Sequence, residues 1–121
     1  ALFHPSFTPP AALRETVRRN VFRKGAAAPF LRTLRRTMTL RGVRPAVWKK
    51  SRAQLAGVTC PVLFVHGRED VVLPVQQSID GQALTQGARI EIFDSCGHTP
   101  QVEQADRFNA SLGDFLRATA R

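Results

Sequence analysis

Several features are missing or scarce in these 121 residues, and each absence narrows the possible class of protein. The chain has no apolar run near the roughly 18 residues that a membrane-spanning helix needs, so we expect no membrane span. It shows no signal-peptide pattern either, and this favours a cytoplasmic protein. It begins at Ala1 without an initiator Met, so we expect it to be a segment of a longer protein.

Acidic residues are almost absent from the first half of the chain. Residues 1–57 hold 13 Lys and Arg against Glu15 alone, whereas residues 58–121 hold 5 against 8 acids. Such an asymmetry indicates either a nucleic-acid or anionic-surface partner, or a solvated lid whose acidic counterpart lies in other sequence.

The chain has only two cysteines, Cys60 and Cys96. Cys60 precedes the first predicted strand and Cys96 follows the second. Parallel strands of four or five residues, at about 3.3 Å per residue, separate these ends by more than a disulfide spans. We therefore expect two free thiols, each buried by packing, in a reducing compartment.

Two predicted strands dominate residues 57–121. Val62 to Val65 is an apolar run too short for a helix, bracketed by Pro61 and Gly67, as is typical of a buried parallel strand. Arg89 to Phe93 alternates apolar and polar residues and forms the second strand.

Two helices complete this half. Pro74 is placed to start one between the strands, and an apolar stripe predicts the other from about Pro100 to Ala118. The pattern is a βαβα unit, so the fold class is α/β.

The sequence pattern of residues 1–56 predicts three short helices and no strand. The helices run from Pro9 to about Lys24, from Pro29 to Gly42, and from Pro45 to Leu55. We expect three of their large apolar side chains to pack in a core: Phe30, Met38 and Trp48.

An acid and a histidine follow the two predicted strands. Asp70 lies just beyond the first strand and His98 just beyond the second. The carboxyl ends of parallel strands meet at one edge of a sheet, where open α/β folds place their chemistry. Asp70 would accept the Nδ1 proton of His98 and leave Nε2 as a base. Gly97 would permit a close backbone approach that a side chain would block.

Nearby residues leave alternatives. Glu69 and Asp94 are alternative acids, and His66 is expected to pack beside the sheet edge. Ser95 and Cys96 lie too close to His98 in sequence to serve as nucleophiles.

The second half of the chain resembles the α/β-hydrolase fold enzymes that carry a helical cap, such as epoxide hydrolases, meta-cleavage-product hydrolases and haloperoxidases. The resemblance rests on Gly67-Arg-Glu-Asp70-Val-Val-Leu-Pro74, on Cys96-Gly97-His98, and on Glu103, Phe108 and Phe115-Leu116. It implies a helical cap segment at residues 1–56 and the C-terminal part of the catalytic α/β sheet at residues 57–121. It also implies that Asp70 is the triad acid and His98 the triad base.

In these enzymes the chain order is nucleophile, acid, histidine, and the nucleophile lies in a Gly-x-Ser-x-Gly elbow or an Asp equivalent. These 121 residues contain no such elbow. The resemblance thus implies a nucleophile upstream of Ala1, and as partner the missing N-terminal half or a second copy of the chain. It implies neither cofactor nor metal.

The reaction stays open among ester, epoxide, haloalkane, perhydrolase and carbon–carbon bond chemistry. Meta-cleavage-product hydrolases have aromatic residues shortly after the histidine, where this chain has Thr99 and Val102. We expect hydrolysis of a small, largely apolar substrate such as an ester. The alternative is a non-catalytic basic domain that contacts nucleic acid or an anionic surface, against which the lack of a recognised nucleic-acid module argues.

Overall fold

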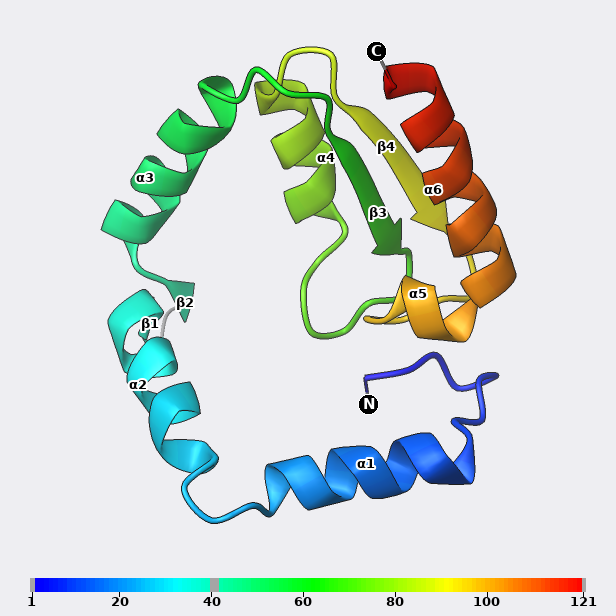
Figure 1. Ribbon diagram of the computed structural model, residues 1–121. Helices are drawn as coiled ribbons and strands as arrows, with labels where there is room; N and C mark the ends of the chain where they lie inside the picture. Colours follow the sequence, from blue (N-terminus) through cyan, green and yellow to red (C-terminus); the bar gives the residue numbers. More distant parts are fainter. Residues whose placement is uncertain (1, 40–41, 121) are drawn as a thin grey trace. The chain divides into compact units, whose positions relative to one another are not determined.

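The computed structural model describes residues 2–39 and 42–120 (Figure 1). The chain divides into two compact units. One consists of Ala1–Thr8 and Gln54–Arg121, and the other of Pro9–Ala53.

The first unit is built on two parallel strands, β3 (Leu63–Gly67) and β4 (Arg89–Phe93). Leu63 lies opposite Arg89 and Gly67 opposite Phe93. The predicted parallel pair is confirmed, although β3 starts one residue later than expected and runs on to Gly67. Within the described residues β3 pairs on one side only, so its side chains are half-buried up to Val65 rather than fully buried.

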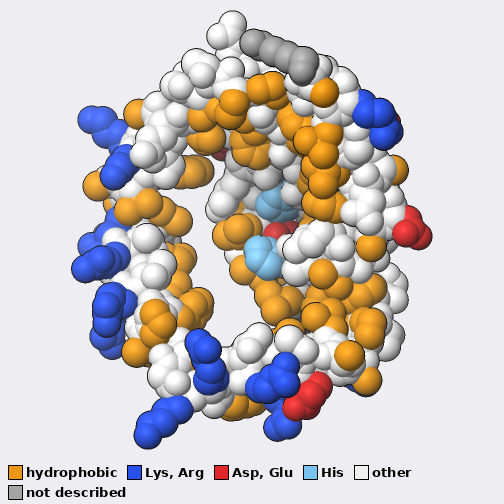
Figure 2. Space-filling view, in the orientation of Figure 1, with side chains coloured by type: hydrophobic (Ala, Val, Ile, Leu, Met, Phe, Trp, Pro, Cys, Tyr) orange, Lys and Arg blue, Asp and Glu red, His pale blue; other side chains and the backbone are white. Residues whose placement is uncertain are grey.

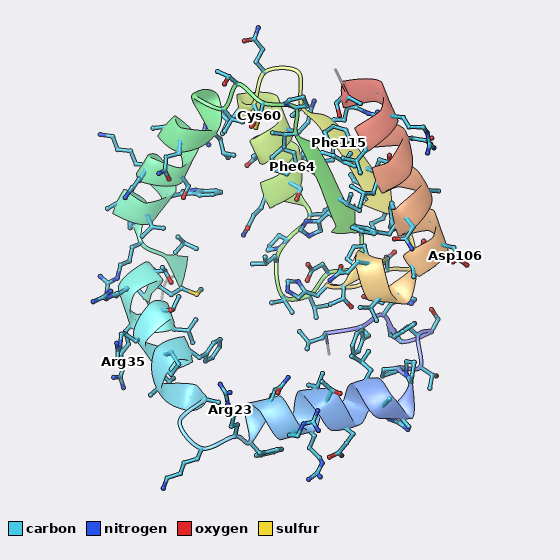
Figure 3. The ribbon with its side chains drawn as sticks, viewed as in Figure 1. Arg23, Arg35, Cys60, Phe64, Asp106 and Phe115 are labelled. Atoms are coloured by element: carbon cyan, nitrogen blue, oxygen red, sulfur yellow. The ribbon has the colours of Figure 1, made fainter. Side chains whose placement is uncertain are left out.

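Helix α4 (Gln76–Leu84) covers one face of this sheet. Its Gly81 packs against the Phe64 ring so closely that a Cβ on Gly81 would lie only 3.1 Å from that ring. The small residue lets the helix approach the strand closely. Phe64 therefore lies on the α4 side of β3, whereas Phe115 comes from the helix on the other side (Figure 3).

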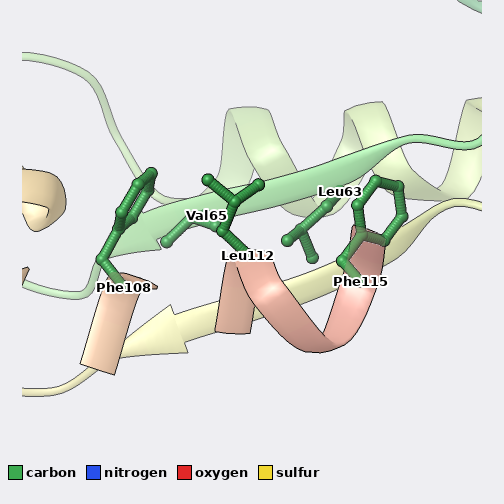
Figure 4. A pocket seen from close by; sticks show the side chains of 5 residues that line it. All are labelled: Leu63, Val65, Phe108, Leu112 and Phe115. Carbon is green, nitrogen blue, oxygen red and sulfur yellow. The ribbon is translucent and has the colours of Figure 1, made fainter. Parts of the chain in front are cut away.

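Helix α6 (Ala105–Thr119) covers the opposite face. Leu63 and Val65 alternate with Phe64 and so turn toward α6, where they share an apolar pocket with three side chains of that helix: Phe108, Leu112 and Phe115 (Figure 4). Phe93 and Cys96 are wholly buried.

The last helix is interrupted, which the sequence pattern did not predict. Helix α5 (Pro100–Glu103) ends before Gln104, whose backbone leaves the helical region (φ −134°, ψ 56°). The Gln104 side-chain amide donates to the carbonyl of Asp94 at 2.7 Å and so ties the break to the end of β4.

The second unit contains helices α1 (Ala11–Val21) and α2 (Ala27–Thr37) and most of α3 (Pro45–Ala56). The three predicted helices are confirmed, but the expectation of no strand was wrong. Strands β1 (Met38–Thr39) and β2 (Gly42–Val43) pair antiparallel between α2 and α3.

The expectation that Phe30, Met38 and Trp48 pack in a core was also wrong. Phe30 is 64% exposed, and Met38 and Trp48 are each 42% exposed. None of the described residues of α1, α2 and α3 is buried, because these short helices share few contacts with one another. Figure 2 shows Lys and Arg side chains gathered over these helices. Within residues 2–39 and 42–120, no helix is long and apolar enough to cross a membrane.

Candidate active site

Asp70 and His98 meet at the carboxyl ends of β3 and β4. Nδ1 of His98 lies 2.8 Å from Oδ2 of Asp70. The Asp70 side chain is 3% exposed, whereas that of His98 is 32% exposed. An ionised carboxylate only accepts hydrogen bonds, so Nδ1 of His98 carries the proton. Nε2 of His98 has no hydrogen-bond partner among the described residues and is left as a proton acceptor.

The other carboxylate oxygen of Asp70 is held by its own loop. Oδ1 accepts hydrogen bonds from the backbone N–H groups of Val72, at 2.7 Å, and Leu73, at 3.0 Å. Burial on its own would raise the pKa of Asp70. The hydrogen bonds from His98, Leu73 and Val72 outweigh burial and lower that pKa below its usual value. Asp70 is therefore an ionised acid fixed in place.

Two glycines allow close backbone approaches around the site, Gly67 between the two loops and Gly97 toward residues 2–4. A Cβ on Gly67 would lie 2.0 Å from the carbonyl oxygen of Gly97, and a Cβ on Gly97 would lie 2.8 Å from the backbone nitrogen of His4. The predicted close approach at Gly97 is confirmed. Gly67 allows a separate close approach, to the backbone of Cys96 and Gly97, whereas the sequence pattern indicated this glycine only as the end of the strand.

His66 is buried, as expected, but it does more than pack. Its Nε2 lies 2.9 Å from the carbonyl oxygen of Leu73 and 3.2 Å from Oδ2 of Asp70, and its Nδ1 lies 2.7 Å from Oγ of Ser78. A carbonyl only accepts, so Nε2 carries the proton and Nδ1 accepts from the Ser78 hydroxyl. Asp70 thus faces two imidazoles. The signal that could have revealed this was the placement of His66 next to the end of the strand that Asp70 follows.

The two alternative acids have other partners. Glu69 accepts a hydrogen bond from the backbone N–H of Cys96 at 3.0 Å. Asp94 is exposed and pairs with Arg68, which lowers the pKa of Asp94. Among the described residues, Asp70 is the one carboxylate that is hydrogen-bonded to His98.

The cysteines do not resemble activated nucleophiles. Both are free thiols, as expected, but Cys60 is exposed, so the expectation that it packs was wrong. Burial, followed by the charges of Glu103 and Glu69, raises the pKa of Cys96 to about 11. A thiol that stays protonated and shielded is inert at neutral pH. Ser95 is exposed in the turn before Cys96, and among the described residues no hydrogen bond joins its hydroxyl to His98.

A small cleft of about 180 Å³ opens beside the Asp70–His98 pair. Its walls are formed by Val65, His66, Gly67, Asp70, Leu73, His98 and Pro100. Apart from the two imidazoles and the carboxylate, these walls are apolar. Within the part of the chain that the structure describes, no cluster of His, Cys, Asp and Glu could hold a metal ion.

No protein-family model matches the chain. Among curated proteins, it is 36% identical over 66 residues to the 2-hydroxymuconate semialdehyde hydrolase of Pseudomonas sp. strain CF600. That match covers 54% of this chain and 23% of the relative. The chain therefore spans about a quarter of the length of that hydrolase.

Solved structures agree with this similarity. The chain is 34% identical to the meta-cleavage product hydrolase CumD, with a TM-score of 0.54 over 55% of this chain and 25% of that one. It is 26% identical to the esterase RhEst1 from Rhodococcus sp. ECU1013, with a TM-score of 0.55 over 57% and 25%. A serine hydrolase involved in carbazole degradation, at 19% identity, matches 97% of this chain and 43% of its own length with a TM-score of 0.71. This last likeness shows the fold alone, and it includes the helical segment.

Proposed function

This chain carries the C-terminal portion of the α/β-hydrolase fold, and we propose that it supplies the acid, Asp70, and the base, His98, of a nucleophile–histidine–acid triad. The observation that carries the proposal is the 2.8 Å hydrogen bond from Nδ1 of His98 to a shielded Asp70 carboxylate. It fixes the imidazole tautomer whose Nε2 can accept a proton.

The proton chemistry follows from that tautomer. With a serine nucleophile, Nε2 of His98 takes the hydroxyl proton as the acyl-enzyme forms and returns it to the leaving group. With an aspartate nucleophile, Nε2 instead takes a proton from the water that attacks the covalent intermediate. Asp70 stabilises the imidazolium in both cases. The chain has no Gly-x-Ser-x-Gly elbow, so we assign the nucleophile to a segment N-terminal to Ala1.

The substrate class that we propose is a small, largely apolar compound such as an ester. The apolar residues in the cleft wall, Val65, Leu73 and Pro100, support it, as does the similarity to both an esterase and meta-cleavage product hydrolases. Thr99 and Val102 stand where the resemblance leads us to expect aromatic residues in carbon–carbon bond hydrolases, which favours the ester. The helices of residues 1–56 would form the cap over such a substrate.

The deciding test is Asp70→Asn in the full-length protein, assayed with short-chain p-nitrophenyl esters. We expect kcat to fall by about 10⁴, because the amide stabilises the wrong tautomer of the histidine. Asp94→Asn is the matched control: that carboxylate is exposed and paired with Arg68, so kcat should stay unchanged. A fully active Asp70→Asn enzyme would move the acid elsewhere and overturn the assignment.

A second candidate is the basic binding domain. Residues 1–57 hold 13 Lys and Arg against Glu15, and Glu15 pairs with Arg18 at 3.0 Å, so nearly all of this positive charge is uncompensated within the segment. Charge alone would give weak, salt-sensitive nucleic-acid binding with Kd of roughly 10⁻⁴ to 10⁻⁶ M. Tight, sequence-selective binding that persists at raised salt would favour this candidate over the hydrolase.

A further inference from the structure

His98 lies in a loop formed by residues 96–99. Every backbone N–H group of this loop donates a hydrogen bond to an acceptor outside it. The N–H of Cys96 donates to Oε2 of Glu69 at 3.0 Å, that of Gly97 to Oε2 of Glu103 at 2.9 Å, that of His98 to the Leu2 carbonyl at 2.8 Å, and that of Thr99 to Oε1 of Glu103 at 3.0 Å. A non-repetitive loop is thereby held almost as completely as a strand.

Glu103 is the centre of this arrangement. Its Oε2 accepts from the backbone of Gly97 and also from that of His4, at 2.7 Å. Its Oε1 accepts from the backbone of Thr99 and from the Thr99 hydroxyl, at 3.1 Å. One carboxylate therefore receives four donors, two of which are the N–H groups immediately before and after His98.

The charge of Glu103 strengthens this hold. Burial on its own would raise the pKa of Glu103, but the backbone hydrogen bonds from His4, Gly97 and Thr99 outweigh it and lower that pKa below its usual value. Hydrogen bonds to an ionised carboxylate are about twice as strong as those between neutral groups. Among the described residues, no hydrogen bond joins this carboxylate to the His98 ring, and Glu103 does not line the cleft.

We propose that Glu103 is a positioning residue for His98. It holds the backbone on both sides of the histidine, so that Nδ1 stays within hydrogen-bond distance of Asp70 and the imidazole stays in the wall of the cleft. The inference rests on the proposed function only insofar as His98 is the catalytic base. The positioning itself can be measured without turnover.

The experiment compares Glu103→Gln with Glu91→Gln in the full-length protein. Glu91 is the matched control, since its carboxylate accepts from the Ser111 hydroxyl at 2.5 Å, away from the His98 loop. Two NMR readouts report positioning: the downfield proton on Nδ1 of His98, and the hydrogen-exchange protection of the Gly97 and Thr99 amides. We expect Glu103→Gln to broaden or abolish the Nδ1 proton signal of His98 and to reduce the exchange protection of the Gly97 and Thr99 amides. Glu91→Gln should change neither readout.

The kinetic readout separates positioning from binding. We expect Glu103→Gln to lower kcat by about 10²-fold with little change in KM, the size of effect that a misplacement near 1 Å produces. Glu103→Asp keeps the charge but withdraws it by one methylene, and should give intermediate values. It also serves as the test if Glu103→Gln does not fold.

A normal Nδ1 proton and normal amide protection in a folded Glu103 variant would overturn the inference. If the wild-type protein hydrolyses no ester and yet loses the Nδ1 signal on Glu103 substitution, the positioning stands and the proposed function fails.

Discussion

Gly67 packs directly against the backbone of Gly97: a Cβ on Gly67 would lie 2.0 Å from the Gly97 carbonyl oxygen and 2.3 Å from that of Cys96. Gly67 is the last residue of β3, and Asp70 follows three residues later. Gly97 directly precedes His98. The approach of the Asp70 loop to the His98 loop therefore depends on the absence of a side chain at Gly67.

Gly67→Ala should destabilise the first unit and separate Asp70 from His98, because the new methyl group would meet backbone atoms that cannot move aside. We expect a loss of about 1–3 kcal/mol or more in the free energy of unfolding, measured by urea denaturation. Gly113→Ala is the matched control in α6, where the nearest atom, 3.3 Å away, is the flexible end of Arg117. Alanine there should stabilise the helix by roughly 0.5–1 kcal/mol. Equal effects at both positions would contradict the packing argument.

Ser78→Ala should destabilise the fold because it leaves Nδ1 of the buried His66 without its partner. The expected cost is about 1–3 kcal/mol, again from urea denaturation. Ser6→Ala removes a hydroxyl–imidazole bond of the same 2.7 Å length, between Ser6 and His4, but at an exposed position where water replaces it. Its effect should be near zero. An unchanged free energy of unfolding in Ser78→Ala would show that the Ser78 hydroxyl does not hold His66 in place.

The stability of the first unit should fall on acidification. The pKa values of Asp70 and Glu103 are lowered in the folded state. A carboxyl with a lowered folded pKa stabilises the fold above its unfolded pKa of about 4 and loses that contribution as pH falls through the folded value. Urea midpoints should thus be level between pH 7 and about pH 5 and decline below about pH 4. The decline should be shallower in Glu103→Gln. Midpoints that rise on acidification would contradict the pKa directions.

The two thiols should react at very different rates. Cys60 is exposed, whereas Cys96 is wholly buried with its pKa raised to about 11. A disulfide reagent at pH 8 should label Cys60 at once and Cys96 only upon unfolding. Cys60→Ser should remove the fast reaction entirely. Two fast thiols in the folded chain would mean that the loop around Cys96 opens readily.

The 121-residue chain by itself should associate or expose apolar surface. Within the described residues, β3 pairs with β4 alone, and Leu63 and Val65 line an open apolar pocket against α6. An unpaired strand edge beside apolar surface is a site for further pairing. Sedimentation with an added hydrophobic dye reports both outcomes. A monodisperse monomer without dye binding would mean that residues 1–56 cover the sheet.

The strands and the Asp70–His98 pair could be predicted because their signals are local. A short apolar run ended by Gly67 and an alternating run before Cys96 indicate strands, and residues just past two parallel strands share one edge. The break at Gln104 was not predictable in this way. Its residue type suits a helix, and the interruption coincides with a hydrogen bond from its side chain to the Asp94 carbonyl, ten residues earlier. The exposure of Phe30 and Trp48 was missed because an amphipathic stripe predicts a buried face and not what covers it.

Local periodicity and the spacing of a few special residues determined by themselves the α/β class, the order of helices and strands, and the presence of an acid and a histidine at one sheet edge. Only the tertiary structure decided that His66 is a second imidazole at Asp70 and that Glu103 holds the backbone on both sides of His98. The physical reason is the sequence separation of the interacting groups. Periodicity depends on neighbours within a few residues, whereas the Glu103 carboxylate can accept from the N–H of His4, at the other end of the chain, only after folding has brought the two within hydrogen-bond distance.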